Sequence, residues 1–296
     1  MGMIRILGTG QGDLFQPATP ESLAEQHELW AADMQALSGF TPECAPEGIG
    51  WKRESDCPGD VLVCGPCGST MDVAHAAWRE GKLQPWGSVL APVQANGRGQ
   101  VRRPWLSTPG NMFATVACPP APEDWSEVRS LLLGYLFATA LETMFGPVRV
   151  KWPNDLLMQD KKIGGILVEE RGDCILAGIG LNLIWAPDVQ KLREGHSIPA
   201  GIIPSASVGL GPLRLWLSLV NQLKTSYTAL LGSHSRADFL TLFRSKLAWR
   251  GKRVQVQEGA HIRYTATITG VSGRGELMLD RDGEEVLLVS GDVTPL

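Results

Sequence analysis

The sequence predicts an α+β fold in which a mixed sheet packs with helices and a small β-barrel follows at the C-terminus. Strand-like and helix-like segments are mixed between residues 61 and 249 but do not alternate strictly, which favours α+β over a doubly wound sheet. Residues 250–296 contain only short apolar segments separated by Gly, Asp or Ser, a pattern typical of a small barrel. The predicted domains are therefore an N-terminal extension (1–60), a main domain (61–249) and the barrel (250–296).

Composition narrows the class of protein. The 296 residues are 44% hydrophobic and 20% charged, as in globular proteins, and the formal net charge of −4 provides no basic field for DNA or an anionic membrane. The first ten residues do not resemble a secretory signal, and the longest apolar run, Leu131–Leu141, is too short to span a bilayer. Six cysteines in such a chain are expected to be free thiols in a reducing cytoplasm.

The N-terminal extension is the least regular part of the chain. One helix is expected over residues 21–37, and prolines and glycines then break the pattern up to Gly59. The stretch carries ten acidic and three basic residues, which disfavours a DNA-binding helix-turn-helix.

From residue 61 onward the expected elements are clearer. Ser69-x-x-Asp72 has the form of a capping box and predicts a helix through Trp78, and Ser126 is expected to cap an apolar helix that ends near Phe145. Two further helices are expected over residues 212–231 and 236–248. Strands are expected over residues 61–64, 88–93, 112–118, 148–151, 156–158, 163–169, 174–183, 254–256, 263–268, 276–279 and 285–289.

Cys64 and Cys67 form a Cys-x-x-Cys pair between an expected strand and an expected helix. Such a pair can serve as a redox or metal site, but no second Cys-x-x-Cys completes a zinc site. The pair is therefore more simply explained as incidental.

The loop from Gln94 to Gly99 is rich in glycine and arginine, and Arg102, Arg103 and Trp105 follow it. Glycines let a backbone approach an anion closely, and arginines bind carboxylate or phosphate with two parallel hydrogen bonds. The loop is a candidate anion-binding segment, although many surface loops share its composition.

Residues Arg149–Asp155 read Arg-Val-Lys-Trp-Pro-Asn-Asp. The first three end an expected strand, Pro153 favours extended geometry at Trp152, and Asn154 and Asp155 favour a turn. The segment therefore presents Lys151 at a strand end, either as a functional cation or as a solvated lysine in an ordinary hairpin.

Two expected strands are interrupted by glycine, at Lys162–Glu169 and at Gly178–Asn182. Glycine within a strand indicates a bulge, a close approach of a ligand, or tight packing against a neighbouring element. Neither segment distinguishes these interpretations by itself.

Taken in this order, the motifs resemble those of the biotin–protein ligase family. The match comprises Ser69-Thr70, Gln94–Gly99, Lys151–Asp155, Lys162–Glu169 and Gly178–Asn182. The segments 251–254 and 290–293 likewise resemble the start and end of the family's SH3-like C-terminal domain. The sequence departs from the family pattern at Met71, where asparagine is frequent, at Gln100, where a second arginine is usual, and at Arg102, where glycine is usual.

The resemblance implies a catalytic domain of the class II synthetase-like kind, which makes biotinyl-5′-AMP from biotin and ATP with Mg²⁺. It then transfers biotin to a lysine of a biotin carboxyl carrier protein. Lys151 and Arg98 would be the catalytic residues, and the resemblance identifies no metal ligand. The residues implied for biotin are Ser69, Thr70, Met71, Gln94, Arg98, Gly99, Gln100, Lys151, Gly164 and Gly165. Those implied for the nucleotide are Arg98, Arg102, Arg103, Trp105, Asn154, Lys162 and Asn182.

Three alternatives remain: a lipoate–protein ligase-like enzyme, a biotin-sensing repressor, and a biotin-binding paralogue with weak ligase activity. The Gly-Arg-Gly loop and the β-rich tail favour biotin over lipoate, the acidic N-terminus disfavours a repressor, and Lys151 disfavours an inactive paralogue. No DNA or membrane partner is expected, and a homodimer is left open.

Overall fold

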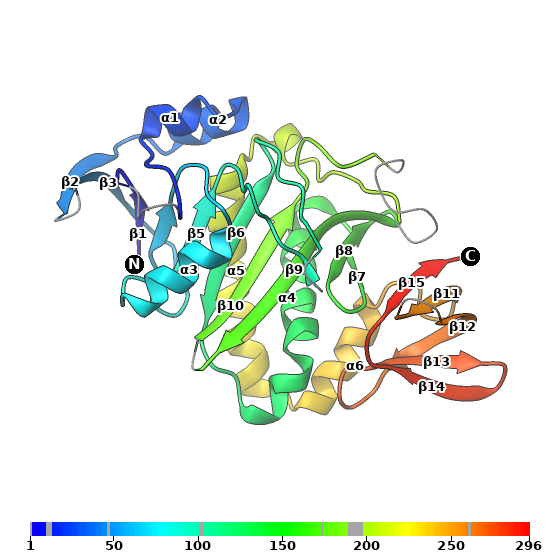
Figure 1. Cartoon of the computed structure of the whole chain (residues 1–296). Coiled ribbons are helices and arrows are strands. Elements are labelled where there is room, and N and C mark those ends of the chain that lie inside the picture. Colours follow the sequence, from blue (N-terminus) through cyan, green and yellow to red (C-terminus); the bar gives the residue numbers. More distant parts are fainter. Residues whose placement is uncertain are drawn as a thin grey trace. The chain divides into compact units, whose positions relative to one another are not determined.

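The computed structural model describes residues 2–9, 14–45, 48–100, 103–172, 174–188, 198–259 and 262–296. They form two compact units (Figure 1). Unit 1 comprises Met1–Pro120, Gly164–Ala186 and Ile202–Thr225. Unit 2 comprises Ala121–Ile163, Pro187–Gly201 and Ser226–Leu296.

A mixed sheet forms the centre of unit 1. Its strands follow the order β2-β3-β1-β4-β5-β6-β10-β9, with β1 and β5 parallel to β4 and the other pairs antiparallel. Every residue of β4, β5 and β6 is buried, which agrees with their continuous apolar sequences. The strands are β1 (Gly2–Ile6), β2 (Thr41–Ala45), β3 (Gly48–Ser55), β4 (Val61–Val63), β5 (Ser88–Ala91), β6 (Met112–Cys118), β9 (Lys161–Arg171) and β10 (Cys174–Leu181).

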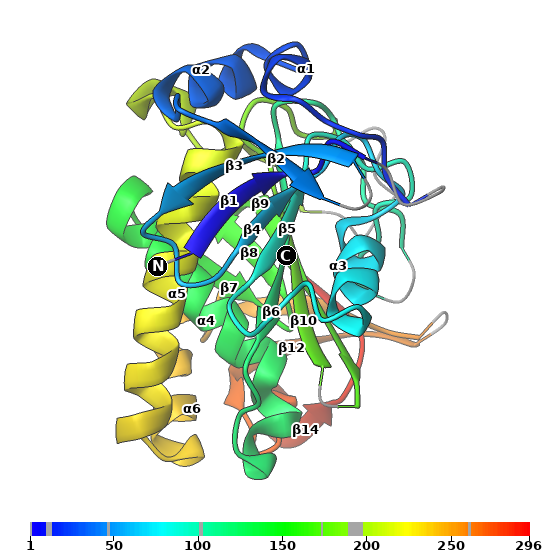
Figure 2. The same cartoon turned by 90° about the vertical axis from the view of Figure 1, so that its left-hand side faces the viewer.

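Helices cover both faces of this sheet. The helix α3 (Thr70–Arg79) lies on one face, and the first part of α5 (Pro212–Ser233) lies on the other (Figure 2). The Trp216 indole of α5 donates a hydrogen bond to the Ser88 hydroxyl of β5 (2.9 Å), so a buried polar pair connects helix and sheet. The sheet therefore provides a rigid base for the loops at its strand ends.

The N-terminal extension belongs to the same sheet through β1, β2 and β3. The expected helix over residues 21–37 is wrong as one element, because the chain forms α1 (Pro20–Ala24) and α2 (Glu28–Ala36) instead. His27 has an extended backbone, and its ring accepts a hydrogen bond from the Leu29 amide (3.1 Å), so it caps a new helix inside the apolar pattern.

Asp33 of α2 caps the distant helix α5. Its buried carboxylate accepts hydrogen bonds from the amides of Gly211 (3.1 Å), Leu213 (2.8 Å) and Arg214 (3.2 Å), and from the Arg214 guanidinium. Burial raises the pKa of the Asp33 carboxyl, against the effect of these hydrogen bonds. The N-terminal extension thus supplies the anion at the start of a core helix.

Unit 2 begins with a 3₁₀ turn, η2 (Glu123–Val128), which leads into the helix α4 (Arg129–Phe145). Ser126 lies within that turn, and Val128 occupies the N-cap position without a side-chain hydrogen bond, so the expected Ser126 cap is wrong. The hairpin of β7 (Arg149–Lys151) and β8 (Asp155–Met158) follows, and α6 (Arg236–Lys246) packs against α4.

The C-terminal part of unit 2 is a five-stranded antiparallel sheet of the SH3-like kind, in the order β14-β13-β12-β11-β15 (Figure 1). Four of its strands coincide with the predicted segments, whereas the last, β15, was not predicted. The strands are β11 (Arg253–Glu258), β12 (Ile262–Val271), β13 (Leu277–Arg281), β14 (Glu284–Leu288) and β15 (Asp292–Pro295).

Among the described residues, one helical segment, Glu123–Phe145, is long and apolar enough to cross a membrane by length and composition. It is mostly buried within the protein, as the core helix of a globular domain also is.

Candidate functional site

The start of α3 in unit 1 holds a buried cluster of hydroxyl and amide groups. The Ser69 hydroxyl accepts from the Met71 amide (3.3 Å) and caps the helix. The amide and hydroxyl of Thr70 both donate to Gln94 Oε1 (2.8 and 3.0 Å), and the Thr115 hydroxyl donates to the Thr70 hydroxyl (2.8 Å). The structure therefore holds Thr70, Gln94 and Thr115 in one network, with Ser69 adjacent in the chain, and these groups have donors and acceptors of the kind that a small polar ring needs.

The loop that contains Gly97, Arg98 and Gly99 folds back on itself. The Trp105 amide donates to the Gly97 carbonyl (2.8 Å), and the Gly99 amide donates to the Arg103 carbonyl (2.7 Å). A Cβ atom on Gly97 would lie 2.7 Å from the Trp105 carbonyl oxygen, so only glycine allows this close approach. Val101 and Arg102 lie outside the described residues.

Arg98 is held by carboxylates of two different elements. Its guanidinium donates to both oxygens of Asp72 on α3 (2.8 Å each), and it lies 3.7 Å from Glu169 on β9. Glu169 also contacts the His75 ring of α3 at 3.1 Å. The hydrogen bond to Asp72 raises the pKa of Arg98, which therefore stays cationic in the loop.

Glycines of β10 and β9 allow close packing around this cluster. A Cβ atom on Gly180 would meet the Trp105 indole at 2.6 Å, and one on Gly178 would meet the Met71 sulfur at 3.0 Å. On β9, a Cβ atom on Gly164 would meet the Gly180 carbonyl oxygen at 2.6 Å. In the structure, these three glycines accommodate neighbouring protein atoms, which accounts for the glycine-interrupted strands.

Asn182 lies directly after β10 and is buried. The segment that follows it is fixed by Asn111, whose side-chain oxygen accepts from the amides of Leu183, Ile184 and Trp185 (2.9–3.3 Å). The side-chain amide of Asn111 donates to the Trp185 carbonyl (2.8 Å). Asn111 was not predicted as a site residue, although a polar residue immediately before the apolar strand β6 is a usable signal.

Lys151 in unit 2 is buried between carboxylates rather than solvated. Its ammonium group pairs with Asp292 of β15 and lies 3.5 Å from Asp155. Burial acts to lower the pKa of Lys151, but the two carboxylates outweigh it and raise the pKa above its ordinary value. The solvated-hairpin interpretation is therefore wrong, and Lys151 is a fixed cation.

Asp155 links two lysines. It lies 2.6 Å from the Lys162 ammonium group as well as near Lys151. Burial alone would raise the pKa of the Asp155 carboxyl, but Lys162 and Lys151 hold it below its usual value. Trp152 is fixed by a hydrogen bond from its indole to the Gly275 carbonyl of the small sheet (2.8 Å), and Asn154 lies in the adjoining turn.

The predicted residues thus gather in two groups. Unit 1 holds Ser69, Thr70, Met71, Gln94, Arg98, Gly99, Gln100, Arg103, Trp105, Gly164, Gly165 and Asn182. Unit 2 holds Lys151, Asn154 and Lys162. Sequence reasoning missed the charge partners Asp292, Glu169 and His75, and it assigned Asp72 only to helix capping.

No metal-binding group is evident within the described ranges, since none contains a cluster of three or more His, Cys, Asp or Glu side chains suited to a metal. None of the six cysteines forms a disulfide, and Cys64 and Cys67 are buried. A hydrogen bond with Cys67 and burial both raise the pKa of the Cys64 thiol, so Cys64 lacks the thiolate character of a reactive or metal-binding cysteine.

Comparison with known proteins agrees with these features. The sequence model of the "Biotin/lipoate A/B protein ligase family" matches residues 66–183. The "Bifunctional ligase/repressor BirA" of Salmonella typhimurium is 36% identical over 229 residues, which cover 73% of this chain and 68% of that protein. The "Biotin--[acetyl-CoA-carboxylase] ligase" of Paracoccus denitrificans is 26% identical over 200 residues, which cover 64% of this chain and 82% of the relative.

Solved structures show the same fold. The biotin protein ligase of Leishmania major in complex with biotin has a TM-score of 0.57 and 25% identity, over 81% of this chain and 99% of that one. The biotin protein ligase of Aquifex aeolicus in complex with biotin and ATP has a TM-score of 0.62 over 79% of this chain and 97% of that one. Its identity of 22% supports the likeness of fold alone.

Proposed function

Because this chain belongs to the biotin protein ligase family, we propose that it uses ATP to convert biotin to biotinyl-5′-AMP and then transfers the biotinyl group to a lysine of an acceptor protein. The observation that carries this proposal is Lys151, a buried lysine that two carboxylates keep charged at a strand end. A fixed cation in a dry environment is what the first step requires.

The chemistry explains the need for fixed cations. Adenylation brings the carboxylate of biotin against the α-phosphate of ATP, and two unit charges about 4 Å apart repel by roughly 4 kcal/mol at an effective dielectric near 20. Preorganised cations offset this repulsion without reorganising during the reaction. We assign this role to Lys151 and Arg98, both of which carry raised pKa values.

The cluster at the start of α3 is assigned to biotin. The ureido ring of biotin has two N–H donors and one carbonyl acceptor, which match hydroxyl and amide side chains. Ser69, Thr70 and Gln94 offer such groups in a fixed, largely buried arrangement. The full proposed biotin set is Ser69, Thr70, Met71, Gln94, Arg98, Gly99, Gln100, Lys151, Gly164 and Gly165.

The nucleotide is assigned to the loop and to the polar ends of the glycine-interrupted strands. The proposed set is Arg98, Arg102, Arg103, Trp105, Asn154, Lys162 and Asn182. In the second step, a neutral lysine amine of the acceptor attacks the acyl carbon of the mixed anhydride, the acyl–phosphate C–O bond breaks, and AMP leaves. The Gly-Arg-Gly loop would keep water from the adenylate.

Magnesium would enter with ATP. This ion commonly keeps several waters and binds through one or two carboxylates and the substrate phosphates, so it needs no cage made by the protein alone. Both oxygens of Asp155 face lysines, so we assign no carboxylate of the protein to this ion. When bound, the ion would neutralise charge on the leaving pyrophosphate.

The acceptor we propose is a biotin carboxyl carrier protein domain, and the site of action the cytoplasm. Residues 61–249 would form the catalytic domain and residues 250–296 the SH3-like domain. We propose no DNA-binding role for residues 1–60, which contribute strands to the sheet of unit 1. Whether the active form is a homodimer is a separate question for solution measurements.

One experiment tests the assignment directly. The protein is incubated with ATP, Mg²⁺ and labelled biotin or labelled lipoate, and adenylate is measured before any acceptor is added. We expect biotinyl-adenylate only. Lipoyl-adenylate alone would favour a lipoate ligase, and the absence of either adenylate would favour a binding protein without ligase activity.

A further inference from the structure

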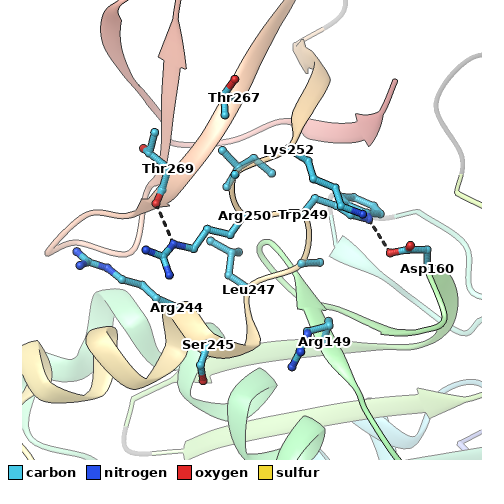
Figure 3. Close-up of a pocket in the computed structure, with 13 residues that line it drawn as sticks. Arg149, Asp160, Arg244, Ser245, Leu247, Trp249, Arg250, Lys252, Thr267 and Thr269 are labelled. Carbon is cyan, nitrogen blue, oxygen red and sulfur yellow. Dashed lines mark hydrogen bonds between the residues drawn. The ribbon is translucent and has the colours of Figure 1, made fainter.

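A hollow of about 680 Å³ lies in unit 2 between the end of α6, the strand β7 and the strand β12 (Figure 3). This volume is in the range of small-molecule sites. The proposed assignments for biotin and ATP use none of the residues that line it. Four of those residues are basic, namely Arg149, Arg244, Arg250 and Lys252, and one, Asp160, is acidic.

The four basic side chains have no carboxylate partner among the residues that the structure describes. Other cations of unit 2 do: Arg236 pairs with Glu127 (3.3 Å), and Lys162 pairs with Asp155 (2.6 Å). The single lining carboxylate, Asp160, accepts a hydrogen bond from the Trp249 indole (2.8 Å) and pairs with none of the four cations, so the lining has four positive charges against one negative charge. The hollow is therefore a concentration of positive charge in a protein whose formal net charge is −4.

The backbone that carries these cations is well fixed. Leu247 forms a β-bridge with Val150, next to Arg149, and the Ala248 amide donates to the Val150 carbonyl (2.9 Å). The turn that follows is pinned to β12, since the Gly251 amide donates to the Ile268 carbonyl (2.7 Å) and the Ile268 amide donates to the Lys252 carbonyl (3.2 Å). The cations are thus attached to a rigid rim.

Two residues at this rim adopt backbone conformations that non-glycine residues seldom have. Trp249 has φ of 57° and Asp160 has φ of 58°, and the hydrogen bond between their side chains joins them (Figure 3). Asp160 forms the two-residue turn between β8 and β9 together with Gln159 (φ of 51°), a usual hairpin geometry. Its hydrogen bond with Trp249 therefore connects this turn to the rim of the hollow.

The side chains also fit oxyanion chemistry. In Figure 3 the guanidinium groups of Arg244 and Arg250 extend in the same direction, and Arg250 donates to the Thr269 carbonyl (3.3 Å), which orients it. Guanidinium groups match the oxygens of phosphate with two parallel hydrogen bonds, and the hydroxyl of Thr267 on the lining adds a neutral donor.

We propose that this hollow is a second anion site, distinct from the adenylation chemistry, and that it binds a small molecule that carries two or more phosphate groups. A multivalent anion is required because the cations are exposed. Each single ion pair in water is worth only about 0–1 kcal/mol, so one phosphate would bind weakly whereas several charges engaged together add up. The phosphates could belong to free inorganic polyphosphate or to a nucleotide.

The test localises binding by hydrogen–deuterium exchange mass spectrometry, with inorganic tripolyphosphate as the probe. We expect slower exchange in peptides that cover residues 244–252 and 265–270 of the intact protein. The variant Arg244→Ala/Arg250→Ala should weaken this protection about tenfold, which is about 1.4 kcal/mol in total and is what the loss of two exposed ion pairs accounts for.

A matched control removes two positive charges from the small sheet, at positions that do not line the hollow. Arg253→Ala/Arg263→Ala changes two exposed arginines outside the hollow and should leave the protection unchanged. Circular dichroism of both variants establishes that they fold, and Arg250→Gln alone provides a milder test. A second titration with guanosine 5′-diphosphate distinguishes the sources, since tighter binding than that of inorganic pyrophosphate indicates a nucleotide.

No change in exchange of these peptides at millimolar tripolyphosphate would overturn the proposal, as would equal protection in the Arg244→Ala/Arg250→Ala variant. Because the readout is local exchange, the result stands whether or not the chain forms biotinyl-adenylate.

Discussion

The two cations assigned to catalysis, Lys151 and Arg98, are held in opposite ways. The Lys151 side chain is only 7% exposed and lies against two largely buried carboxylates, whereas the Arg98 side chain is 32% exposed and lies against the part-exposed Asp72 and, at 3.7 Å, Glu169. Burial of Lys151 costs desolvation free energy but fixes the position of its charge. Arg98 keeps its charge in contact with water, so its ion pairs contribute less. A buried cation provides permanent preorganisation, and a part-exposed one can exchange partners at low cost.

This difference in burial predicts different consequences when an ion-pair partner of Lys151 or of Arg98 is removed. Removal of a buried ion-pair partner leaves an uncompensated charge and affects both chemistry and stability. Removal of a part-exposed partner changes how long the loop stays in place and affects the fold little. The following variants separate these two kinds of effect.

The largest effect is expected for Lys151→Ala. Loss of a fixed cation at the phosphate should lower the rate of adenylate formation by at least about 10²-fold. The measurement is formation of labelled biotinyl-adenylate, with Lys161→Ala, an exposed lysine near the same hairpin, as the control for charge. Adenylate formation at the parent rate would show that Lys151 is not the catalytic cation.

The next effect is expected for Asp292→Asn. This variant removes one of the two carboxylates that hold Lys151, and it should lower the free energy of unfolding by about 1–3 kcal/mol and slow adenylate formation. Asp282→Asn, whose exposed side chain lies 3.9 Å from Arg253, should leave both quantities unchanged. Equal urea unfolding curves for parent and Asp292→Asn would contradict a stabilising role for the pair.

Deletion of residues 250–296 extends this test to the whole small sheet. The truncation removes Asp292 and the Gly275 carbonyl that fixes Trp152, so acceptor biotinylation should fall further than in Asp292→Asn. The assay is transfer of labelled biotin to a carrier domain by truncated protein that circular dichroism shows to be folded. A folded truncation with the full rate would reject the contribution of the small domain.

A smaller effect is expected in the loop, where Gln100 stands in place of a usual arginine. Gln100→Arg should slow release of the adenylate by about tenfold, because a charge-assisted hydrogen bond exceeds a neutral one by roughly 1.4 kcal/mol or less. Arg102→Gly should speed release. Stopped-flow dissociation of preformed adenylate measures both, and unchanged rates in the two variants would show that these side chains do not retain the intermediate.

The smallest effect is expected for Asp72→Asn. The neutral amide keeps the shape of the side chain but removes the ion pair with Arg98. Because a part-exposed pair is worth about 1 kcal/mol, the adenylate should dissociate about fivefold faster. Stability should hardly change. If Asp72→Asn instead destabilises the fold as strongly as Asp292→Asn, the contrast between the two cations is wrong.

Local patterns in the sequence were sufficient for most strands and for the motif residues. The apolar run 112–118 predicted β6 without error, and Ser69 predicted the start of α3. Two helix errors arose from local competition: His27 begins a new helix inside one apolar pattern, and a 3₁₀ turn places Ser126 before the helix it was expected to cap. The strands β1, β2, β3 and β15 were not predicted at all.

Long-range partners could not be predicted in this way. Lys151 and Asp292 are 141 residues apart, and Arg98 and Asp72 are 26 apart on different elements. No periodicity connects such positions, because their pairing depends on how strands and helices pack. The motifs therefore indicated candidate residues for the chemistry, and the structure was needed to find the carboxylates that pair with them.

The cap that Asp33 provides for α5 has a consequence for how the chain is made. Asp33 leaves the ribosome about 180 residues before Arg214, the farther of its partners in the chain. Because the chain is synthesised from its N-terminus, the Asp33 carboxylate cannot bond the amides at the start of α5 until that helix has been synthesised. A shortened chain that starts at residue 61 would have α5 without the carboxylate that caps it, so we expect this helix to form less readily in such a chain.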